Sequence, residues 1–191
     1  MRRIFWITLI GAALASLGCV VPSLHPLFTE EDLVFDPHLI GAWVDEDDDF
    51  WVFEKSSKGG YLLTVADRYE LSSFDAHLLE LGSHRFLDLY PRTSSVANSF
   101  HSSHLLRVHT FYKVDLENES LQLIPMSGDW LEEMIQEEAI HVAHAWPEGD
   151  LLLTAQTAEL QELVLVFADD PTAFPTDATA SAVIVLEQTI L

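Results

Sequence analysis

The sequence predicts a mainly β protein, an antiparallel meander that forms a barrel or a sandwich with two short helices packed on it. Three observations support this fold class. Short segments of alternating apolar and polar residues, rich in β-branched and aromatic types, recur between turn sequences. Only two stretches show the helical period. Apolar residues make up 49% of the chain and aromatic residues 10%, enough for a packed core despite the high charge.

The N-terminal residues have the pattern of a bacterial lipoprotein signal. Arg2 and Arg3 are followed by the uncharged run Ile4–Leu17, which is shorter than the ~20 residues of a membrane span. Gly18 and Cys19 then end the stretch "ASLGC", which resembles the lipobox of bacterial lipoproteins. The resemblance implies cleavage before Cys19, a diacylglyceryl group on its sulfur and further acylation, for example with palmitate, at its amine. Several acyl chains give stable attachment where one does not.

Three expectations follow for the organisation of the chain. Residues 1–18 are a signal peptide, 19–36 a lipidated N-terminus and tether, and 37–191 a β-rich globular domain. Val20 stands where lipoproteins retained in the inner membrane carry Asp, which favours an outer-membrane anchor in the cell envelope, facing the periplasm or the cell surface. Two alternatives stay open, namely an ordinary secretory signal with an incidental cysteine and an uncleaved N-terminal helix.

The charge of the chain excludes nucleic acid as a partner. The formal net charge is −22, with 31 acidic residues against 9 lysines and arginines. Removal of Arg2 and Arg3 leaves 7 cations, so the mature charge is 7 − 31 = −24. Such a chain is repelled by phosphate backbones and by anionic lipid headgroups.

The strands are expected wherever alternation lies between turn signals. The turn signals are Lys58-Gly59-Gly60, Gly82-Ser83 and the run Pro147–Asp150. The expected strands are 39–44, 50–55, 61–66, 71–81, 84–90, 104–115, 120–124, 140–146, 151–155 and 182–189.

Two segments have helical spacing instead. The first is expected to begin with a capping box made by Asp129 and Glu132. The second is expected to begin at Thr157, to place apolar residues at i, i+3, i+4 and i+7 from Leu160, and to end before Pro171.

One hairpin can be placed in register from its turn. If Gly82-Ser83 is a two-residue loop, pairing counts back from it and Leu78 faces Leu87 on an apolar side. The opposite side then pairs His77 with Asp88.

The same register pairs Asp75 with Tyr90 and so groups Asp75, His77, Asp88 and Tyr90 into one polar cluster. A carboxylate beside a histidine orients a general base, so a hydrolase-like enzyme is one hypothesis. The alternative is ordinary cross-strand charge matching. No nucleophile motif accompanies the cluster, and the favoured interpretation is a protein that is not an enzyme.

Two further patterns suggest metal ligands but favour none. The acidic loop 45–49 lacks the Gly and Glu of a calcium loop, so a solvated turn is favoured over weak divalent-cation binding. His101 and His104, like His141 and His144, are three residues apart, and on a strand such pairs point to opposite faces. We therefore expect no metal and no cofactor.

The stretch "DPHLIGAW" resembles the Gly-x-Trp motif at the first strand of lipocalins, whose Trp closes one end of a barrel. On that resemblance Trp43 plugs the barrel. Alternation places Trp51 and Phe53 on one face of their strand and Tyr61 on one face of the next. If these faces meet around an unfilled lumen, Trp43, Trp51, Phe53 and Tyr61 line a site for an apolar ligand. The stretches "WVFEKS", "RFLDLYP" and "DWLEEMI" also resemble a group of small bacterial envelope lipoproteins, a resemblance that brings no activity. The expected function is a non-catalytic binding or interaction module, holding an apolar small molecule or docking an envelope protein.

Overall fold

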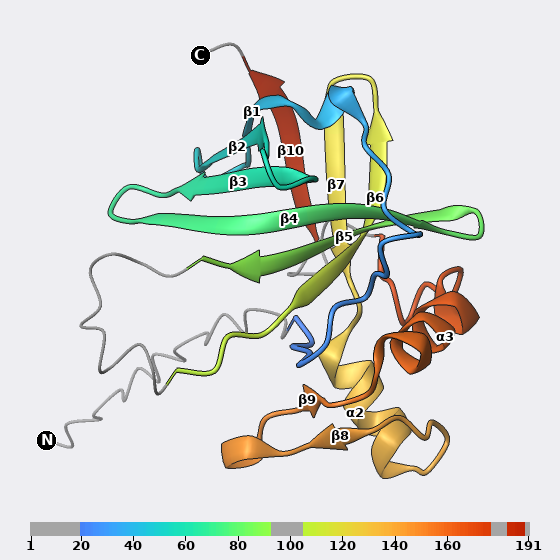
Figure 1. Ribbon diagram of the computed structural model, residues 1–191. Helices are drawn as coiled ribbons and strands as arrows, with labels where there is room; N and C mark the ends of the chain where they lie inside the picture. Colours follow the sequence, from blue (N-terminus) through green and yellow to red (C-terminus); the bar gives the residue numbers. More distant parts are fainter. Residues whose placement is uncertain (1–19, 93–104, 177–182, 190–191) are drawn as a thin grey trace, which may run out of the picture.

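The chain folds into a closed barrel of eight antiparallel strands, which confirms the predicted fold class (Figure 1). The computed structural model describes residues 20–92, 105–176 and 183–189. Residues 1–19, with Cys19, and both His101 and His104 lie outside the described residues. The barrel strands are β1 (Gly41–Val44), β2 (Phe50–Lys55), β3 (Tyr61–Ala66), β4 (Leu71–Leu81), β5 (His84–Pro91), β6 (Thr110–Glu117), β7 (Ser120–Pro125) and β10 (Ile184–Thr189).

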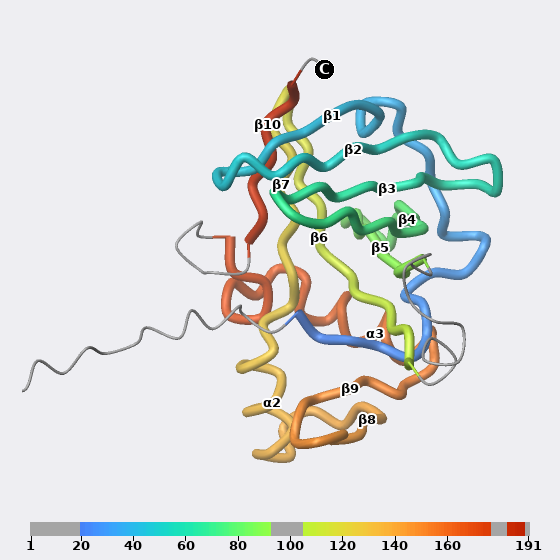
Figure 2. The backbone as a smooth tube through the Cα atoms, turned by 90° about the vertical axis from the view of Figure 1, so that its left-hand side faces the viewer, coloured from blue at the N-terminus to red at the C-terminus, as the bar shows by residue number. Residues whose placement is uncertain are grey.

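The strands follow one another around the barrel as a meander with a single insertion. β1 to β7 pair in chain order, and β10 closes the barrel between β7 and β1. The insertion between β7 and β10 holds α2 (Gly128–Gln136), β8 (His144–Ala145), β9 (Leu152–Leu153) and α3 (Thr157–Phe167). The short 3-10 helices are η1 (Pro37–Leu39) and η2 (Pro147–Gly149). Figures 1 and 2 show the inserted elements gathered below the barrel.

Alternation along the strands separates two apolar cores. One core fills the barrel, with the inward residues of all eight strands. The other lies outside the barrel, where β4 to β7 pack against the insertion and the N-terminal segment. The buried residues of the inner core are Leu39, Trp43, Phe53, Tyr61, Leu63, Ala76, Leu78, Leu87, Leu89, Tyr112, Leu121, Leu123 and Leu186.

The register predicted for the β4–β5 hairpin is confirmed. Leu78 pairs with Leu87 and His77 with Asp88 around the two-residue turn. Leu78 and Leu87 are completely buried inside the barrel. Positive φ at Gly82 explains why a glycine begins this tight turn.

The N-terminal segment differs from the expected tether, because residues 20–28 pack against the body. Val21 is 3% exposed, and Ser23 and Leu27 are completely buried. Ser23 exchanges two backbone hydrogen bonds of 2.8 Å with His109, just before β6, and bridges Leu153 of β9 on its other side. The segment thus joins the barrel to the β8–β9 sheet through isolated β-bridges at Ser23. The prolines and the lack of periodicity predicted a free tether, but burial of the segment's apolar residues holds it against the body.

Three expected strands are much shorter than predicted, and the one expected at 151–155 is reduced to the two residues of β9. The strand expected at 104–115 is β6, which begins only at Thr110 because the backbone of His109 pairs with Ser23 instead. The strand expected at 140–146 is reduced to β8. Ala139 and Ile140 donate their N–H groups to the carbonyl of Met134, which extends the end of α2 and delays the strand.

The second helix begins at Thr157 as predicted, but the capping box of the first helix was wrong. Ser127, not Asp129, is the N-cap of α2, and its Oγ accepts a 3.3 Å hydrogen bond from the N–H of Trp130. Asp129 lies in the first turn, where its charge favours the positive end of the helix dipole. Among the described residues, neither helix has the length and apolar character needed to cross a bilayer.

Candidate functional site

The expected ligand-binding residues lie inside the barrel, where three of them are part of the packed core. Trp43 is 0% exposed, and Phe53 and Tyr61 are 1% exposed. The indole N–H of Trp43 donates a 3.0 Å hydrogen bond to the carbonyl of Leu39 in η1. The rings of Phe53 and Tyr61 meet edge to face, with centroids 6.2 Å apart. These side chains are therefore buried in the inner core of the barrel.

Trp51, the fourth residue of this set, lies nearer the acidic loop. It pairs with Trp43 across β1 and β2, packs against the inner core and is half-buried. Its indole N–H donates a 3.3 Å hydrogen bond to the carboxylate of Asp45. The other oxygen of Asp45 accepts from the N–H groups of Asp47 and Asp49, so this carboxylate organises the turn between β1 and β2.

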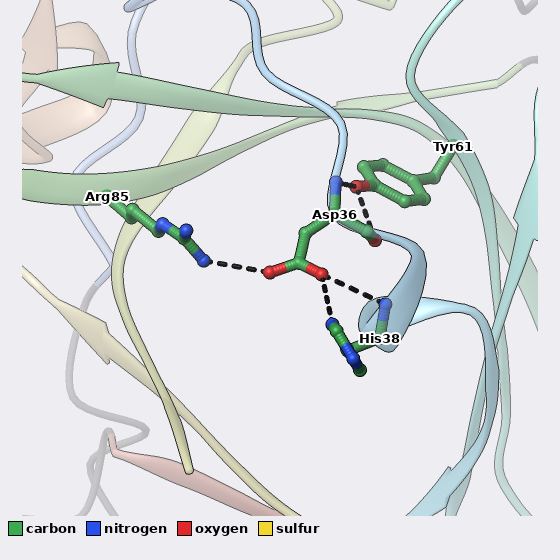
Figure 3. Close-up of polar contacts among 4 residues, drawn as sticks. All are labelled: Asp36, His38, Tyr61 and Arg85. Carbon is green, nitrogen blue, oxygen red and sulfur yellow. Dashed lines mark hydrogen bonds and ion pairs between the residues drawn. The ribbon is translucent and has the colours of Figure 1, made fainter. Parts of the chain in front are cut away.

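Residues 33–40 cross one end of the barrel, and Asp36 fastens them there (Figure 3). The hydroxyl of Tyr61 accepts a 2.7 Å hydrogen bond from the N–H of Asp36 and donates one of 3.0 Å to its carbonyl. The carboxylate of Asp36 accepts from the backbone N–H and Nδ1 of His38 and forms a 2.9 Å ion pair with Arg85. Both hydrogen bonds of the Tyr61 hydroxyl thus hold residues 33–40 in place.

The ionisation of this closure favours a charged Asp36 and a neutral Tyr61. Burial by itself would raise the pKa of Asp36, but the hydrogen bonds from His38 and Arg85 outweigh it and hold the pKa below its ordinary value. Burial raises the pKa of the Tyr61 hydroxyl. At neutral pH, Asp36 thus remains a full acceptor for its donors.

Two hollows are formed by described residues. A shallow groove of about 700 Å³ runs over β1, β2 and β10, and residues such as Gly41, Glu54 and Gln188 line it. A smaller hollow of about 220 Å³ lies beside Val20 and is lined also by Glu132 and Asp150.

The second candidate site, the cluster of Asp75, His77, Asp88 and Tyr90, lies on the outer face of β4 and β5. Asp88 is completely buried. Its Oδ2 accepts a 2.8 Å hydrogen bond from the N–H of Leu27, and its Oδ1 lies 2.7 Å from Nδ1 of His109. The histidine that Asp88 orients is therefore His109, which the sequence analysis did not assign to the cluster.

His77, expected to be the base, makes no such contact. Its Nδ1 is buried without a hydrogen-bond partner among the described residues, and its ring lies 4.5 Å from that of Phe28. Burial lowers the pKa of His77, although the charges of Asp88 and Asp75 oppose this effect. Asp75 lies apart from it in a half-exposed ion pair, 3.7 Å from Arg92.

Tyr90 completes a stack at the edge of the cluster. Its ring lies 4.4 Å from that of His109, and the guanidinium of Arg107 lies 4.9 Å from the tyrosine ring centre on β5. The nearby hydroxyl of Ser23 donates to the carbonyl of His25. The arrangement holds residues 20–28 against the barrel and brings no hydroxyl hydrogen bond to His109 in the described residues.

No group of three or more metal-ligating side chains occurs within the described ranges. His141 is exposed and lies outside any strand, while Nδ1 of His144 lies 2.8 Å from the carbonyl of Val142. The acidic loop 45–49 is a tight turn in which Asp48 has a positive φ.

A row of apolar side chains crosses the outside of β1 to β4. Val44 pairs with Phe50, Phe50 with Ala66, and Ala66 with Leu71. Their sequence neighbours Trp43, Trp51 and Val65 pack in the inner core, so the row faces outward. We refer to Val44, Phe50, Ala66 and Leu71 as the outer apolar row.

The outer apolar row is open to solvent and bordered by acids. Leu71 is 74% exposed, Phe50 39% and Tyr69, in the adjacent β3–β4 turn, 91%. Loss of hydration and the charges of Asp45, Asp67 and Asp47 raise the pKa of Asp49, although the charge of Arg68 in the β3–β4 turn opposes them.

Comparison of the chain with protein-family models, with curated proteins and with solved structures finds no match.

Proposed function

We propose that the chain is a lipid-anchored, non-catalytic module of the bacterial envelope that docks a partner protein on the outside of its barrel. The observation that carries this proposal is the outer apolar row, which exposes Phe50 and Leu71 on the outside of a barrel whose inward side chains form a buried core. Large apolar side chains gathered on one exposed surface favour association.

The acidic border determines the chemistry of the partner. Asp45, Asp47 and Asp49 lie at one turn beside the row and Asp67 at the other. Complementary charge steers association and disfavours partners of like charge. The partner should therefore present an apolar centre with a basic rim, and its binding should weaken as salt is added.

The anchor is proposed from the lipobox resemblance at Cys19. It would keep the domain in the envelope, where a non-catalytic module can meet a membrane-bound partner. Incorporation of labelled palmitate into the native protein tests it, and Cys19→Ser should lose both the label and the membrane fraction. Label retained by Cys19→Ser would contradict anchoring at this residue.

Site-specific photocrosslinking in native membranes tests the docking surface. A photoreactive residue at Leu71 should crosslink one basic protein, while the same residue at Glu117, an exposed position at the end of β6, should not. Reversing the charge of Asp47 and Asp67 should abolish the product, whereas reversing Glu137 and Glu138 after α2 should leave it. Equal crosslinking from both positions, or none from Leu71, would rule out this surface.

A second candidate function has one observation in its favour. The buried carboxylate of Asp88 lies 2.7 Å from His109, as in a base held by an acid. A hydrolase of this kind should cleave an activated ester, and His109→Gln should lose the activity while Asp75→Asn keeps it. Absence of ester hydrolysis above that of His109→Gln removes this candidate.

A further inference from the structure

We propose that the end of the β8–β9 sheet beside Val20 lies against the bilayer, with Trp146 in the headgroup region of zwitterionic lipid. This inference rests on the proposed lipid anchor at Cys19. It adds the orientation of the domain on the membrane and the residue that contacts lipid.

The packed residues begin directly after Cys19, so an anchor at Cys19 would be joined to the domain without a long linker. Val20 bridges Ser127 at the start of α2, and Val21 is 3% exposed. The carbonyl of Pro22 accepts a 2.9 Å hydrogen bond from the N–H of Leu153. Consecutive Cα atoms are only about 3.8 Å apart. A lipid on Cys19 would therefore hold the surface around Val20 within a few residues' reach of the headgroups.

Trp146 lies at the same end of the sheet as Val20. Ala145 pairs with Leu152 in the antiparallel β8–β9 hairpin, and Leu153 bridges Ser23 in parallel. Counting one residue along each strand places Trp146, Leu151 and Val21 in one row across the sheet. Two strand spacings make this row about 10 Å wide. Figure 1 shows the β8–β9 hairpin below the first described residues, with its turn at the left.

The turn after Trp146 keeps it at this end. The N–H of Asp150 donates to the carbonyl of Pro147 at 3.0 Å, which closes η2 into one tight turn. Asp150 itself lines the 220 Å³ hollow together with Val20. The row that contains Trp146 is therefore adjacent to the point where the anchor would enter the body.

The exposed indole has the chemistry of a membrane-interface residue. Trp146 is 38% exposed, and its described aromatic contact is the ring of His144, 5.6 Å away. Tryptophan favours the boundary between headgroups and acyl chains because its ring is apolar and its N–H is polar. Each interfacial zone is about 5–7 Å thick, so an indole close to the anchor can reach it.

The charges beside this end determine the lipid. Glu132 and Asp150 line the adjacent hollow, and Glu148 is exposed in η2. Carboxylates at this position repel anionic headgroups and tolerate zwitterionic ones. We therefore expect contact with phosphatidylethanolamine or phosphatidylcholine, reduced in phosphatidylglycerol.

Fluorescence quenching by brominated lipid tests the inference on the native, acylated protein. The protein is reconstituted in phosphatidylcholine vesicles whose acyl chains carry bromine near the headgroup. Tryptophan emission should be quenched, more strongly than by bromine at the chain ends. Trp146→Phe should lose most of the quenching, while the matched Trp51→Phe, in the barrel, should retain it. Phosphatidylglycerol vesicles should quench less.

The outcomes distinguish this inference from the anchor. The orientation is overturned if the protein carries the palmitate label but Trp146→Phe leaves the quenching unchanged. It is also overturned if the labelled, unsubstituted protein shows no quenching. Neither result contradicts the anchor. Absence of palmitate label overturns both. Should Trp146→Phe fail to fold, the dependence of quenching on bromine depth in the unsubstituted protein decides, because equal quenching at both depths contradicts an interfacial indole.

Discussion

Replacement of Asp88 by Ala should release residues 20–28 from the barrel at a large cost in stability. The carboxylate is completely buried and has two donors, the N–H of Leu27 at 2.8 Å and Nδ1 of His109 at 2.7 Å. Each buried donor left without an acceptor costs about 1–3 kcal/mol, so Asp88→Ala should lower the free energy of unfolding by about 2–6 kcal/mol. Asp88→Asn should cost less, because its amide keeps an oxygen for Leu27.

Urea unfolding followed by circular dichroism measures this cost, and limited proteolysis reports whether residues 20–28 have detached. The matched control is Asp75→Ala, which removes a carboxylate from the same outer face. Asp75 is half-exposed and 3.7 Å from Arg92, and such a surface ion pair contributes less than about 1 kcal/mol. If Asp88→Ala costs no more than Asp75→Ala, the hydrogen bonds of Asp88 do not hold the segment and the reasoning fails.

Three other predictions follow from the two cores. Burial lowers the pKa of His77 in the folded protein, so as pH falls the unfolded chain takes up this proton before the folded protein does. The free energy of unfolding should therefore fall as pH drops below about 6.5, and it should fall less steeply in His77→Leu. Urea midpoints at several pH values measure this dependence. Leu78→Ala, inside the barrel, should cost about 2–5 kcal/mol, whereas Arg85→Ala, half-exposed beside Asp36, should cost under about 1 kcal/mol; the reverse order in urea unfolding would contradict the register. Nζ of Lys113 donates a 2.6 Å hydrogen bond to the carbonyl of Ala168 at the end of α3, so Lys113→Met should lower stability by about 1–3 kcal/mol, and an unchanged urea midpoint would show that this contact is not needed.

Local patterns predicted the strands whose pairing is also local. The bounds of β2, β3 and β4 agree with the sequence, and the β4–β5 register follows from Gly82-Ser83 and the alternation on both sides. A two-residue turn fixes every later pair, because a slip by one residue would move the apolar face outward. Non-local pairing could not be read in this way.

The N-terminal segment and His109 show where sequence reasoning ended. Residues 20–28 do not alternate between apolar and polar side chains as a strand would. Ser23 forms β-bridges only because His109 and Leu153, from distant parts of the chain, offer backbone partners. The contact of Asp88 with His109 spans 21 residues and depends on how β5 pairs with β6. The alternation of Arg107, His109 and Lys113 with apolar residues is the one signal that the sequence offers.

The ligand-binding hypothesis stays a prediction, because the sequence does not reveal whether the inward side chains leave room inside the barrel. Inward alternation correctly placed Trp43, Phe53 and Tyr61 on one surface, but alternation does not reveal whether facing side chains meet. Small eight-stranded barrels are just wide enough for side chains to fill. In this chain Leu63 and Leu78, both completely buried, pack in the same core as the aromatic residues.

Titration of the purified acyl-free protein, residues 19–191 with Cys19→Ser, with a fluorescent fatty acid tests most directly whether the function lies outside the barrel. A hollow interior that buried about 300 Å² of apolar ligand surface would yield about 7 kcal/mol before the cost of immobilisation, which is micromolar or weaker binding. Because Trp43, Phe53 and Tyr61 are buried in the inner core, we predict no saturable quenching of tryptophan emission up to the solubility limit of the probe. Saturable quenching that Trp51→Ala weakens would contradict it and restore the barrel as a ligand carrier.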